Sequence, residues 1–534
     1  MSTVEPTYPM AFWNIAAIGK RLRRWLYLGH RWLGILTCLL FAVWFVSGIV
    51  MMYVAFPLLS DVERRASLPP VVWERVALEP GDALASARLA PDDVRRFDLA
   101  MLDAEPVYRI VPWQGSRRTI SAIDGRPVVA VSAERAIAVA RHHPSARRVT
   151  DLGLVARDQW TVPQRFDPLR PLYRIALGDA AGTELYVSAV TGEIALDTSA
   201  RERFWNWFGA VPHWIYFTPV RAKADLWRDV VLWLSGIAAI GAVTGAVVGV
   251  IRVRLRQRYA RGAVTPYRGW MGWHHLGGLV AGATLVSFIV SGWLSMNPNR
   301  WFSPREPDRA TLERYQGTPA PPPLLDRTTL AASCSGATEA RFSQLDGRAQ
   351  IALACSDGRI VTCCGKPASM RESIAAAAQR LIPEAPAPLV VELGEEDLYW
   401  YGHHQERPLP VLRVMFADGP QTWFHIDPTT GEVLSRLDSS NRIYRWLFNA
   451  PHTFDFALLT RHRPAWDLLL IVLSLGGLLV SVSGIVIGWR RLGLKMRRVT
   501  GWPMLRSSFE ACGGSASDPW ANPSQSIQPK PKTL

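Results

Sequence analysis

The stretch Trp32–Val54, WLGILTCLLFAVWFVSGIVMMYV, decides the fold because it contains no charged residue. Three further runs of similar length are also free of charge, namely Val230–Ile251, Leu276–Met296 and Leu468–Trp489. A helix rises about 1.5 Å per residue, so about 20 residues cross the roughly 30 Å hydrocarbon layer of a membrane. The sequence therefore predicts four transmembrane helices and excludes a purely soluble protein. The first run is too long for a cleaved signal peptide and is expected to stay as an anchor.

Charged residues are distributed unevenly around these runs. The chain of 534 residues has 60 Lys and Arg against 45 Asp and Glu, a net charge of +15. The N-terminal segment, the short connection between the second and third runs and the C-terminal tail hold 19 of the basic residues and only three acids. The positive-inside rule therefore places both termini and the short connection in the cytoplasm. Because the two long loops are nearly neutral, nucleic-acid binding is not expected.

The chain also resembles itself, which indicates an internal repeat. A shift of 239 residues superposes identical residues without a gap, and a shift of 244 does so near the start of each half. The matching pairs include Asp158/Asp397, Arg174/Arg413, Thr191/Thr430, Gly192/Gly431, Trp207/Trp446, His213/His452 and Gly245/Gly484 at the first shift, and His30/His274, Gly34/Gly278, Ser47/Ser291 and Gly48/Gly292 at the second. Both halves run in the same direction, so we expect parallel repeats related by a pseudo-two-fold axis along the membrane normal.

Each external loop is predicted to fold as a small α+β module. Alternating residues around Pro171–Leu177 and Glu184–Ile194 indicate two strands joined by a turn, and Leu412–Phe416 and Thr422–Val433 repeat the pattern. An Ala-rich, helix-prone run precedes each pair of strands, at Ser132–Arg141 and Met370–Leu381. The proline-rich stretch Gly317–Leu325 is expected to be a linker or an extended loop.

Four motifs resemble those of a known family. They are Leu28-Gly-His-Arg-Trp-Leu-Gly, Gly272-Trp-His-His-Leu-Gly-Gly, Ala450-Pro-His and Asp427-Pro-Thr-Thr-Gly-Glu-Val. The chain resembles the PepSY-associated transmembrane helix proteins over most of its length, although Ala189-Val190 replaces Asp-Pro in the first half. That family includes bacterial inner-membrane, haem-containing ferrisiderophore reductases. The resemblance implies two periplasmic PepSY-like modules and electron delivery to a ferric siderophore or another ferric chelate.

The expected organisation follows from these observations. It comprises a cytoplasmic segment (1–31), the first membrane helix (32–54), the first PepSY-like module (55–229), the second helix (230–251), a basic cytoplasmic loop (252–275), the third helix (276–296), the second PepSY-like module (297–467), the fourth helix (468–489) and a cytoplasmic tail (490–534).

Two repeated pairs of histidines are the candidate cofactor ligands. His30 and His274 lie at the cytoplasmic starts of the first and third helices, and His213 and His452 lie on the outer side before the second and fourth. A pseudo-two-fold axis brings the members of each pair opposite one another. Two opposed imidazoles make a six-coordinate haem without an open position, which suits electron transfer. We therefore expect two b-type haems, forming a route for electrons across the bilayer.

Two features leave alternatives at these sites. The glycines near the histidines provide clearance for a flat macrocycle, or they only permit close helix packing. His275 is adjacent to His274 and points about 100° away around the helix, so only one of them faces the bundle. The repeat selects His274 and leaves His275 as a hydrogen-bond partner or an alternative ligand.

The remaining histidines are weaker candidates. His142, His143 and His425 are more typical of solvated loop or satisfied strand histidines than of metal ligands. Near His403 and His404, the side chains of Tyr399, Trp400, Tyr401 and Arg407 are expected to form an outer face for an anionic ferric chelate, with arginine attracting its charge.

Four cysteines cluster in the second external loop, namely Cys334, Cys355, Cys363 and Cys364. In an oxidising compartment they favour disulfides over metal binding, and three pairings are possible. Adjacent Cys363 and Cys364 are poor partners for one another because a vicinal disulfide strains its peptide bond. We therefore expect them to bridge to Cys334 and Cys355.

No nucleotide-binding or nucleophile motif is present, and the cytoplasmic segments are too short for a flavin or nicotinamide domain. Electrons must come from a cytoplasmic protein or from quinol. Two alternatives remain from the sequence. One is a non-enzymatic membrane protein whose modules bind or regulate a periplasmic partner. The other is a quinol-linked cytochrome that reduces a different periplasmic acceptor.

Overall fold

The computed structural model describes residues 15–363, 367–402 and 407–500. The chain divides into two compact units. The helical unit comprises Met1–Val46, Leu234–Val290 and Ile471–Leu534, and the sheet unit comprises Ser47–Trp233 and Ser291–Leu470.

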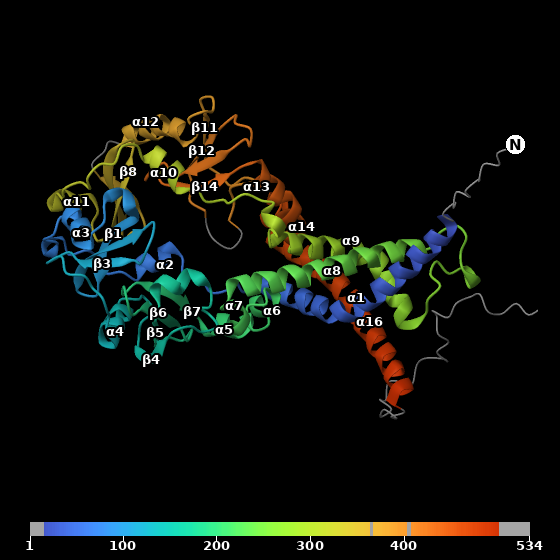
Figure 1. The fold of residues 1–534 in the computed structure, drawn as a ribbon. Helices are drawn as coiled ribbons and strands as arrows, with labels where there is room; N and C mark the ends of the chain where they lie inside the picture. Colours follow the sequence, from blue (N-terminus) through green and yellow to red (C-terminus); the bar gives the residue numbers. More distant parts are fainter. Residues whose placement is uncertain (1–14, 364–366, 403–406, 501–534) are drawn as a thin grey trace, which may run out of the picture. The chain divides into compact units, whose positions relative to one another are not determined.

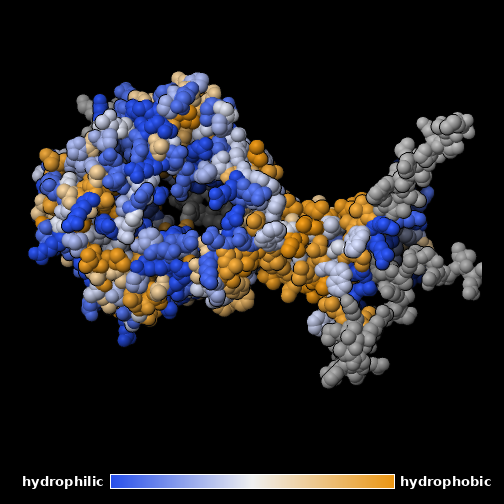
Figure 2. All heavy atoms as spheres, viewed as in Figure 1, coloured by the Kyte–Doolittle hydropathy of each residue, from blue (hydrophilic) through white to orange (hydrophobic). Residues whose placement is uncertain are grey.

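Four long helices account for the apolar runs of the sequence (Figure 1). They are α1 (Ile15–Met51), α8 (Ala224–Arg252), α9 (Gly269–Ser295) and α16 (Arg463–Thr500). Among the described residues these four are long and apolar enough to cross a membrane. Their large apolar side chains are strongly exposed, for example Val280 at 87%, which is expected of a lipid-facing surface and is visible in Figure 2. The protein is therefore a multi-pass membrane protein, as predicted.

Small residues at the contacts let the four helices of the helical unit pack closely. Gly241 of α8 lies against Leu33 and Thr37 of α1, and Gly488 of α16 lies against Ile35 of α1. A Cβ added to Gly477 of α16 would meet the ring of Phe45 at 2.2 Å. Without a hydrophobic driving force between helices in lipid, such close backbone approach is the main source of association.

The described chain contains three antiparallel sheets, all within the sheet unit. The six-stranded sheet has the order β10-β9-β8-β1-β2-β3, and the two four-stranded sheets have the orders β4-β5-β6-β7 and β11-β12-β13-β14. The strands are β1 (Val94–Leu102), β2 (Glu105–Pro112), β3 (Arg118–Ser121), β4 (Thr150–Val155), β5 (Leu172–Ala176), β6 (Glu184–Ser188), β7 (Ile194–Thr198), β8 (Ala337–Leu345), β9 (Arg348–Cys355), β10 (Ile360–Cys363), β11 (Leu389–Leu393), β12 (Val411–Met415), β13 (Trp423–Ile426) and β14 (Val433–Leu437).

The six-stranded sheet joins the two long loops and was not predicted. Strand β1 of the first loop pairs with β8 of the second, with Phe97 opposite Phe342, Asp98 opposite Arg341 and Leu99 opposite Ala340. A buried core that includes Phe97, Tyr108 and Phe342 packs on this sheet. The two long loops are therefore held together by a shared sheet in addition to the predicted pairs of strands.

Each four-stranded sheet packs against a helix, as the sequence predicted. Helix α4 (Ala133–Arg141) contributes Ala136 and Val139 to a core with strands β5 and β6, and α12 (Pro367–Ala378) contributes Ile374 and Ala377 to a core with β12 and β13. The stretch 317–325 lies outside helices and strands, in agreement with the expected extended loop.

A glycine turn docks each four-stranded sheet on the six-stranded one. Gly192 and Gly431 both have positive φ, at +69° and +70°, a conformation that glycine adopts without strain. A Cβ at Gly192 would meet Leu102 at 2.3 Å, and one at Gly431 would meet Leu345 at 3.0 Å. The Thr-Gly-Glu turns are therefore packing elements between the sheets.

Short helices connect these elements. They are α2 (Asp61–Ala66), α3 (Pro80–Ala87), α5 (Ala200–Asn206), α6 (Ala210–His213), α7 (Thr218–Arg221), α10 (Arg309–Gln316), α11 (Arg327–Ser333), α13 (Ser439–Tyr444), α14 (Ala450–Thr453) and α15 (Ala457–Thr460). A π-helical turn, Arg445–Asn449, separates α13 from α14.

Candidate functional site: two histidine pairs

The first histidine pair lies within the helical unit. His30 of α1 and His274 of α9 have ring centres 6.3 Å apart, with their ring planes inclined by 29°. The structure therefore brings together the two residues that the sequence paired at a shift of 244.

Hydrogen bonds fix the orientation of both rings. His30 Nδ1 lies 3.3 Å from the carbonyl oxygen of Gly241 on α8, and His274 Nδ1 lies 3.1 Å from the carbonyl oxygen of Val480 on α16. A carbonyl oxygen accepts only, so Nδ1 must carry the proton and Nε2 must carry the lone pair. This tautomer is the one in which Nε2 serves as a metal ligand, with the carbonyl as its outer partner. The hydroxyl of Ser483 lies 3.1 Å from the same nitrogen of His274.

Glycines around the first pair serve two different purposes. A Cβ at Gly245 would lie 2.6 Å from Cε1 of His30, so this glycine makes room for the ring. A Cβ at Gly484 would lie 2.4 Å from the sulfur of Cys38 and 3.4 Å from Cε1 of His274, so this glycine makes room for both side chains. At Gly278 a Cβ would meet nothing within 4 Å, and at Gly34 it would meet only the sulfur of Cys38, at 3.9 Å. Close packing thus explains the first two glycines, and open space adjoins the second two.

That open space belongs to a cavity of about 150 Å³ in the helical unit. Its lining includes both histidines, Gly34 and Gly278, and also two basic residues, Arg31 and Arg491. Apolar walls with a few polar groups suit a macrocycle that carries carboxylates. The volume is below the roughly 300–1,000 Å³ typical of small-molecule pockets, so a bound macrocycle would have to displace neighbouring side chains.

His275 has a separate and purely local role. Its Nε2 lies 3.0 Å from the carbonyl oxygen of Gly249 on α8, and its Nδ1 lies 2.8 Å from the hydroxyl of Thr265 in the basic connection. Both ring nitrogens are engaged, so this side chain ties the connection to α8. Of the two roles left open by the sequence, the structure supports the hydrogen-bond partner.

The second pair lies within the sheet unit. His213, at the end of α6, and His452, in α14, have ring centres 6.3 Å apart and ring planes inclined by 73°. His213 Nδ1 lies 3.0 Å from the hydroxyl of Ser47, and His452 Nδ1 lies 3.0 Å from the hydroxyl of Ser291. A glycine follows each serine, and a Cβ at Gly48 would approach Cε1 of His213 to 3.5 Å.

The separation of both pairs fits a shared metal ion. A first-row metal binds imidazole nitrogen at about 2.0–2.1 Å. Ring atoms lie about 1.1 Å from the centre of a five-membered ring with bonds near 1.35 Å. Two imidazoles that face one metal from opposite sides therefore have ring centres about 6.3 Å apart. Both pairs have this separation, so the donors present fit an axially ligated haem.

The described residues of the expected outer face for a ferric chelate make local contacts. The hydroxyl of Tyr401 donates to buried Asp455 at 2.5 Å, which also pairs with Arg445, and the Tyr399 hydroxyl accepts from the indole of Trp446 at 3.3 Å. The Arg407 guanidinium lies over the Trp400 ring. His403 and His404 lie outside the described residues. The described members of this face are engaged in local packing.

His425 is a satisfied histidine of strand β13. Its Nε2 accepts from Nε of Arg413 at 2.9 Å, and its Nδ1 lies 3.0 Å from the hydroxyl of Ser435. Burial, followed by the positive charge of Arg413, lowers the pKa of His425 to about 3. His142 and His143 lie at the end of α4, where the Nε2 of His142 is 3.4 Å from Asp103. Across the described residues, no cluster of three or more His, Cys, Asp or Glu side chains could hold a metal ion.

The disulfide differs from the expected pairing. Cys334 is bonded to Cys355, whereas Cys363 is a buried free thiol and Cys364 lies outside the described residues. Cys334 follows α11 and Cys355 ends β9, and the pairing of Ala337 with Cys355 brings them within 5.7 Å between Cα atoms. The expectation of bridges from Cys363 and Cys364 to these two cysteines was wrong for Cys363. The prediction failed because the pairing of β8 with β9, which places Cys334 beside Cys355, was not predicted.

Sequence reasoning did not assign Ser47, Ser291, Gly241 and Val480 to the histidine pairs. A signal for the serines and for Gly245 and Gly484 was present, because each of them recurs in the other half at one of the two shifts, as does the histidine it contacts. The two carbonyl contacts carry no side-chain signal. They follow from helix packing alone.

Comparison with curated proteins gives no match for this chain. A family model does match, the PepSY-associated TM region, over residues 28–491. This range contains both histidine pairs, all three sheets of the described chain and the four candidate membrane spans, except the first turns of α1 and the last residues of α16. The chain therefore belongs to the PepSY-associated TM region family.

Proposed function

We propose that this protein binds two b-type haems and transfers electrons across the bacterial inner membrane to periplasmic ferric iron held in a chelate such as a siderophore. The observation that carries the proposal is the pair of equal 6.3 Å separations between opposed imidazoles. His30 and His274 would hold one haem, and His213 and His452 the other. A haem with two imidazole ligands supplies one-electron chemistry without an open position for oxygen.

The chain's own groups prepare these ligands. The carbonyls of Gly241 and Val480 hold the Nδ1 protons of His30 and His274, which keeps Nε2 directed to a metal. The hydroxyls of Ser47 and Ser291 take the corresponding place for His213 and His452. Arg31 and Arg491, in the lining of the cavity beside the first pair, are suited to the carboxylates of a macrocycle.

We further propose that the two halves are parallel repeats about a pseudo-two-fold axis. Strand β8 begins at Ala337, which is 243 positions after Val94, where β1 begins. If each strand is replaced by the other at this shift, the same positions remain opposite one another. Residue 97 faces 342 and residue 99 faces 340, around the central pair Asp98 and Arg341. Such a self-complementary contact is what a two-fold axis produces. Strands β5 and β7 likewise recur as β12 and β14 at a shift of 239.

The direction of transfer rests on topology. The concentration of Arg in the 252–268 connection and at the two ends of the chain favours a cytoplasmic position for these segments, with the long loops in the periplasm. Because the chain carries no nucleotide-binding motif, we propose that a quinol or a cytoplasmic reductase supplies the electrons.

The test is an absorption spectrum of the full-length protein, purified in detergent after expression with ample haem. The expected result is two low-spin b-type haems per chain, which reoxidise when ferric citrate is added to the reduced protein. Absence of haem would overturn the proposal and favour a protein that binds or regulates a periplasmic partner. Reduced haem that is stable to ferric citrate, but is reoxidised by another periplasmic acceptor, would favour a quinol-linked cytochrome.

A further inference from the structure

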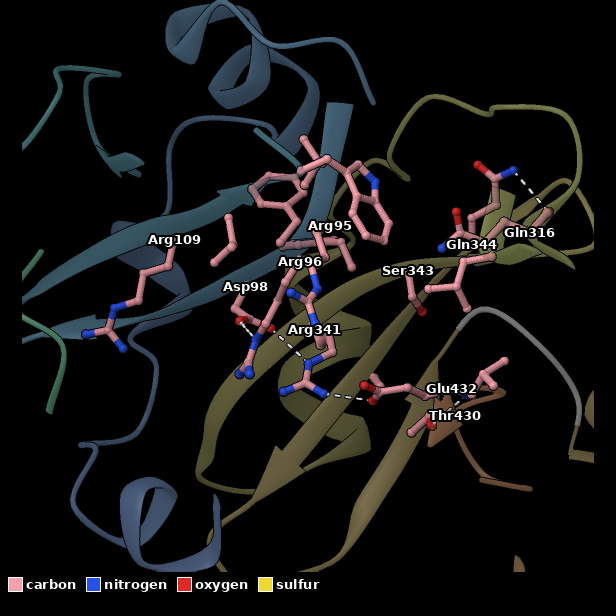
Figure 3. A pocket seen from close by; sticks show the side chains of 18 of the residues that line it. Arg95, Arg96, Asp98, Arg109, Gln316, Arg341, Ser343, Gln344, Thr430 and Glu432 are labelled. Carbon is pink, nitrogen blue, oxygen red and sulfur yellow. Dashed lines mark hydrogen bonds and ion pairs between the residues drawn. The ribbon is translucent and has the colours of Figure 1, made fainter. Parts of the chain in front are cut away.

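A large cavity of the sheet unit lies among its three sheets and has a volume of about 1270 Å³. Strands β1, β2 and β8 line it together with the start of β7 and the Thr-Gly-Glu turn before β14. Figure 2 shows the opening on the surface, and Figure 3 shows its wall. The volume exceeds the roughly 300–1,000 Å³ of typical small-molecule sites. None of the histidine ligands lines this cavity, so it is a separate feature.

Most arginines in the cavity wall are neutralised by neighbouring carboxylates. Arg341 pairs with Asp98 and Glu432 at 3.0 Å each, and Arg64 pairs with Glu339 at 2.6 Å. Figure 3 shows Arg96, Asp98 and Arg341 as one contiguous group. Although burial opposes ionisation, Arg64 and the adjacent arginines lower the pKa of Glu339. These charges are satisfied within the protein and do not require a ligand.

Two arginines of this wall, Arg109 of β2 and Arg165, form no ion pair among the described residues, and of the two Arg109 is buried whereas Arg165 is exposed. Only 7% of Arg109 is exposed, its Nε is buried without a hydrogen-bond partner, and its Nη2 makes one long contact of 3.4 Å to the carbonyl oxygen of Met101. In the described part of the chain no carboxylate lies within ion-pairing distance of its guanidinium. Figure 3 shows this group lying apart from Arg96, Asp98 and Arg341.

The nearest carboxylates are already occupied. Asp98 lies opposite Arg109 in the strand register, but it pairs with Arg96 and Arg341. Glu193 accepts two hydrogen bonds from Arg117, at 2.8 and 3.0 Å, and a third from the hydroxyl of Thr191. A buried charge without a partner destabilises a fold by several kcal/mol. A site that keeps such a charge in the wall of a large cavity is suited to an anion from outside.

Another part of the wall contains an aromatic side chain. Arg95 and Arg309 both lie over the ring of Trp113, at 5.7 and 5.8 Å from its centre, and all three residues line the cavity. Cation–π contacts hold these three side chains together in this part of the wall.

A buried apolar cluster connects this cavity to the second histidine pair. Phe166 and Leu169 line the cavity and belong to the same cluster as Val211. Val211 lies in α6, the helix that ends at His213. The apolar cluster that packs against α6, which ends at His213, therefore also forms part of the cavity wall.

We propose that this cavity binds an anionic ferric chelate, with Arg109 receiving one of its anionic oxygen groups and Trp113 contributing to the wall. The proposal rests on the proposed function for the identity of the metal. It replaces the Tyr399–Arg407 face as the substrate site.

The test measures binding of gallium(III) citrate, a redox-inert stand-in for the ferric chelate, to the full-length protein in detergent by calorimetry and by quenching of Trp fluorescence. Because gallium(III) accepts no electron, this readout is independent of haem and of electron transfer. Arg109→Met is expected to weaken binding at least tenfold, as the loss of a charge-assisted hydrogen bond does. The matched control is Arg118→Gln, an exposed arginine on neighbouring β3 outside the cavity wall, which should bind as the natural protein does.

The same variant carries its own check on folding. Replacing an unpaired buried charge with Met should raise the thermal midpoint of the protein. If the Arg109 variant is more stable and also binds gallium citrate more weakly, the loss of binding is not caused by misfolding. The natural protein then keeps Arg109 for ligand binding at a cost in stability. Unchanged affinity of the Arg109 variant, or equal affinity for metal-free citrate, would overturn the proposal. Gallium citrate binding to a protein that lacks haem would overturn the proposed function and leave this site standing.

Discussion

The two histidine pairs are built from the same residue types, yet the two four-stranded sheets are not. In both pairs, rings with centres 6.3 Å apart lie against glycines, and the glycines and serines match at shifts of 239 or 244. In the sheets, matching positions differ: Tyr186 corresponds to His425, and Asp197 to Arg436. The positions that contact the histidine rings therefore require the same residue types in both halves. A sheet core accepts different residues, provided that its buried polar groups are hydrogen-bonded.

The pairs also differ from one another in the partner of Nδ1. A backbone carbonyl holds each ring of the first pair, and a serine hydroxyl holds each ring of the second. A carbonyl can only accept, whereas a hydroxyl can donate or accept. The first pair is therefore fixed by helix packing and the second by replaceable side chains, and the following predictions use this difference.

The largest effect is expected from removing one histidine of either pair. His274→Ala should eliminate one haem and His452→Ala the other, so that haem per chain falls from two to one in each variant. His462→Ala, an exposed histidine outside both pairs, is the matched control. Haem quantification after alkaline pyridine treatment measures the result.

The ring planes make the two losses distinguishable. The anisotropy of a low-spin ferric haem signal in electron paramagnetic resonance increases as the two imidazole planes approach a right angle. The pair inclined by 73° should give the more anisotropic signal, which His452→Ala should remove, and the pair inclined by 29° the less anisotropic one. Loss of both signals in every histidine variant would indicate one shared site or misfolding and contradict the separate pairs.

A smaller effect is expected at the glycines of the first pair. Gly245→Ala places a Cβ 2.6 Å from the His30 ring and should displace it, lowering haem occupancy at that site and destabilising the fold by about 1–3 kcal/mol. Gly249→Ala on the same helix is the control, because its nearest contact would be an ordinary 3.6 Å.

Gly278→Ala tests whether the glycines provide clearance for a macrocycle or only permit close helix packing. A Cβ there meets nothing within 4 Å, so the change is expected to leave helix packing intact. Loss of haem from this variant alone would identify the open space as macrocycle clearance. Full haem occupancy in it would assign the glycines of this site to packing only.

The serines should have a more modest effect confined to the second pair. Ser47→Ala and Ser291→Ala each remove the partner of one Nδ1, and the loss of such a partner typically lowers metal affinity by about 10–100-fold. Ser483→Ala is the matched comparison in the first pair, where His274 keeps the carbonyl of Val480. Haem retention during dilution in detergent measures the difference. Equal losses from all three variants would contradict the distinction between the pairs.

The sequence was sufficient for features that depend on local pattern or on repetition. Apolar runs predicted the four spans, and the shift of 239 identified strands β5 and β12 and paired His213 with His452. Helix ends were less predictable, because α1 begins at Ile15 and thus continues through the basic residues before Trp32. Basic residues are good helix formers, so the apolar run marks the membrane and not the helix.

Features that depend on long-range pairing were not predictable. Six consecutive residues of β1, Phe97 to Leu102, are buried, so this strand has no alternation to reveal its faces or its partner β8. The Cys334–Cys355 bond depends on that same sheet. Arg109 resembles any other arginine in the sequence, and it stands out only because Asp98 and Glu193 are held by other arginines.

The smallest effects are expected where the sheets differ, and they have opposite signs with pH. Burial, together with the carboxylates of Glu63 and Glu202, raises the pKa of Asp197 to about 6 from 3.8. The folded state then binds more protons than the unfolded state between these values, so this group destabilises the fold as pH rises from about 4 to 6. For His425, with a pKa lowered to about 3 from 6.5, the unfolded state binds more protons, and stability falls as pH drops from 6.5 toward 3.

Asp197→Asn should therefore raise the thermal midpoint at pH 7 and leave it unchanged near pH 4. His425→Tyr introduces the residue found at the matching position of the first sheet. This variant should lose less stability than the natural protein when the pH falls below 6. The midpoint of the full-length protein in detergent, measured from pH 4 to 7, gives both results. Glu372→Gln, an exposed carboxylate on α12, is the control for a general change in charge. Parallel pH profiles for the two variants would show that the sheets respond to pH through groups other than these two, because burial of an acid and burial of a base must shift stability in opposite directions.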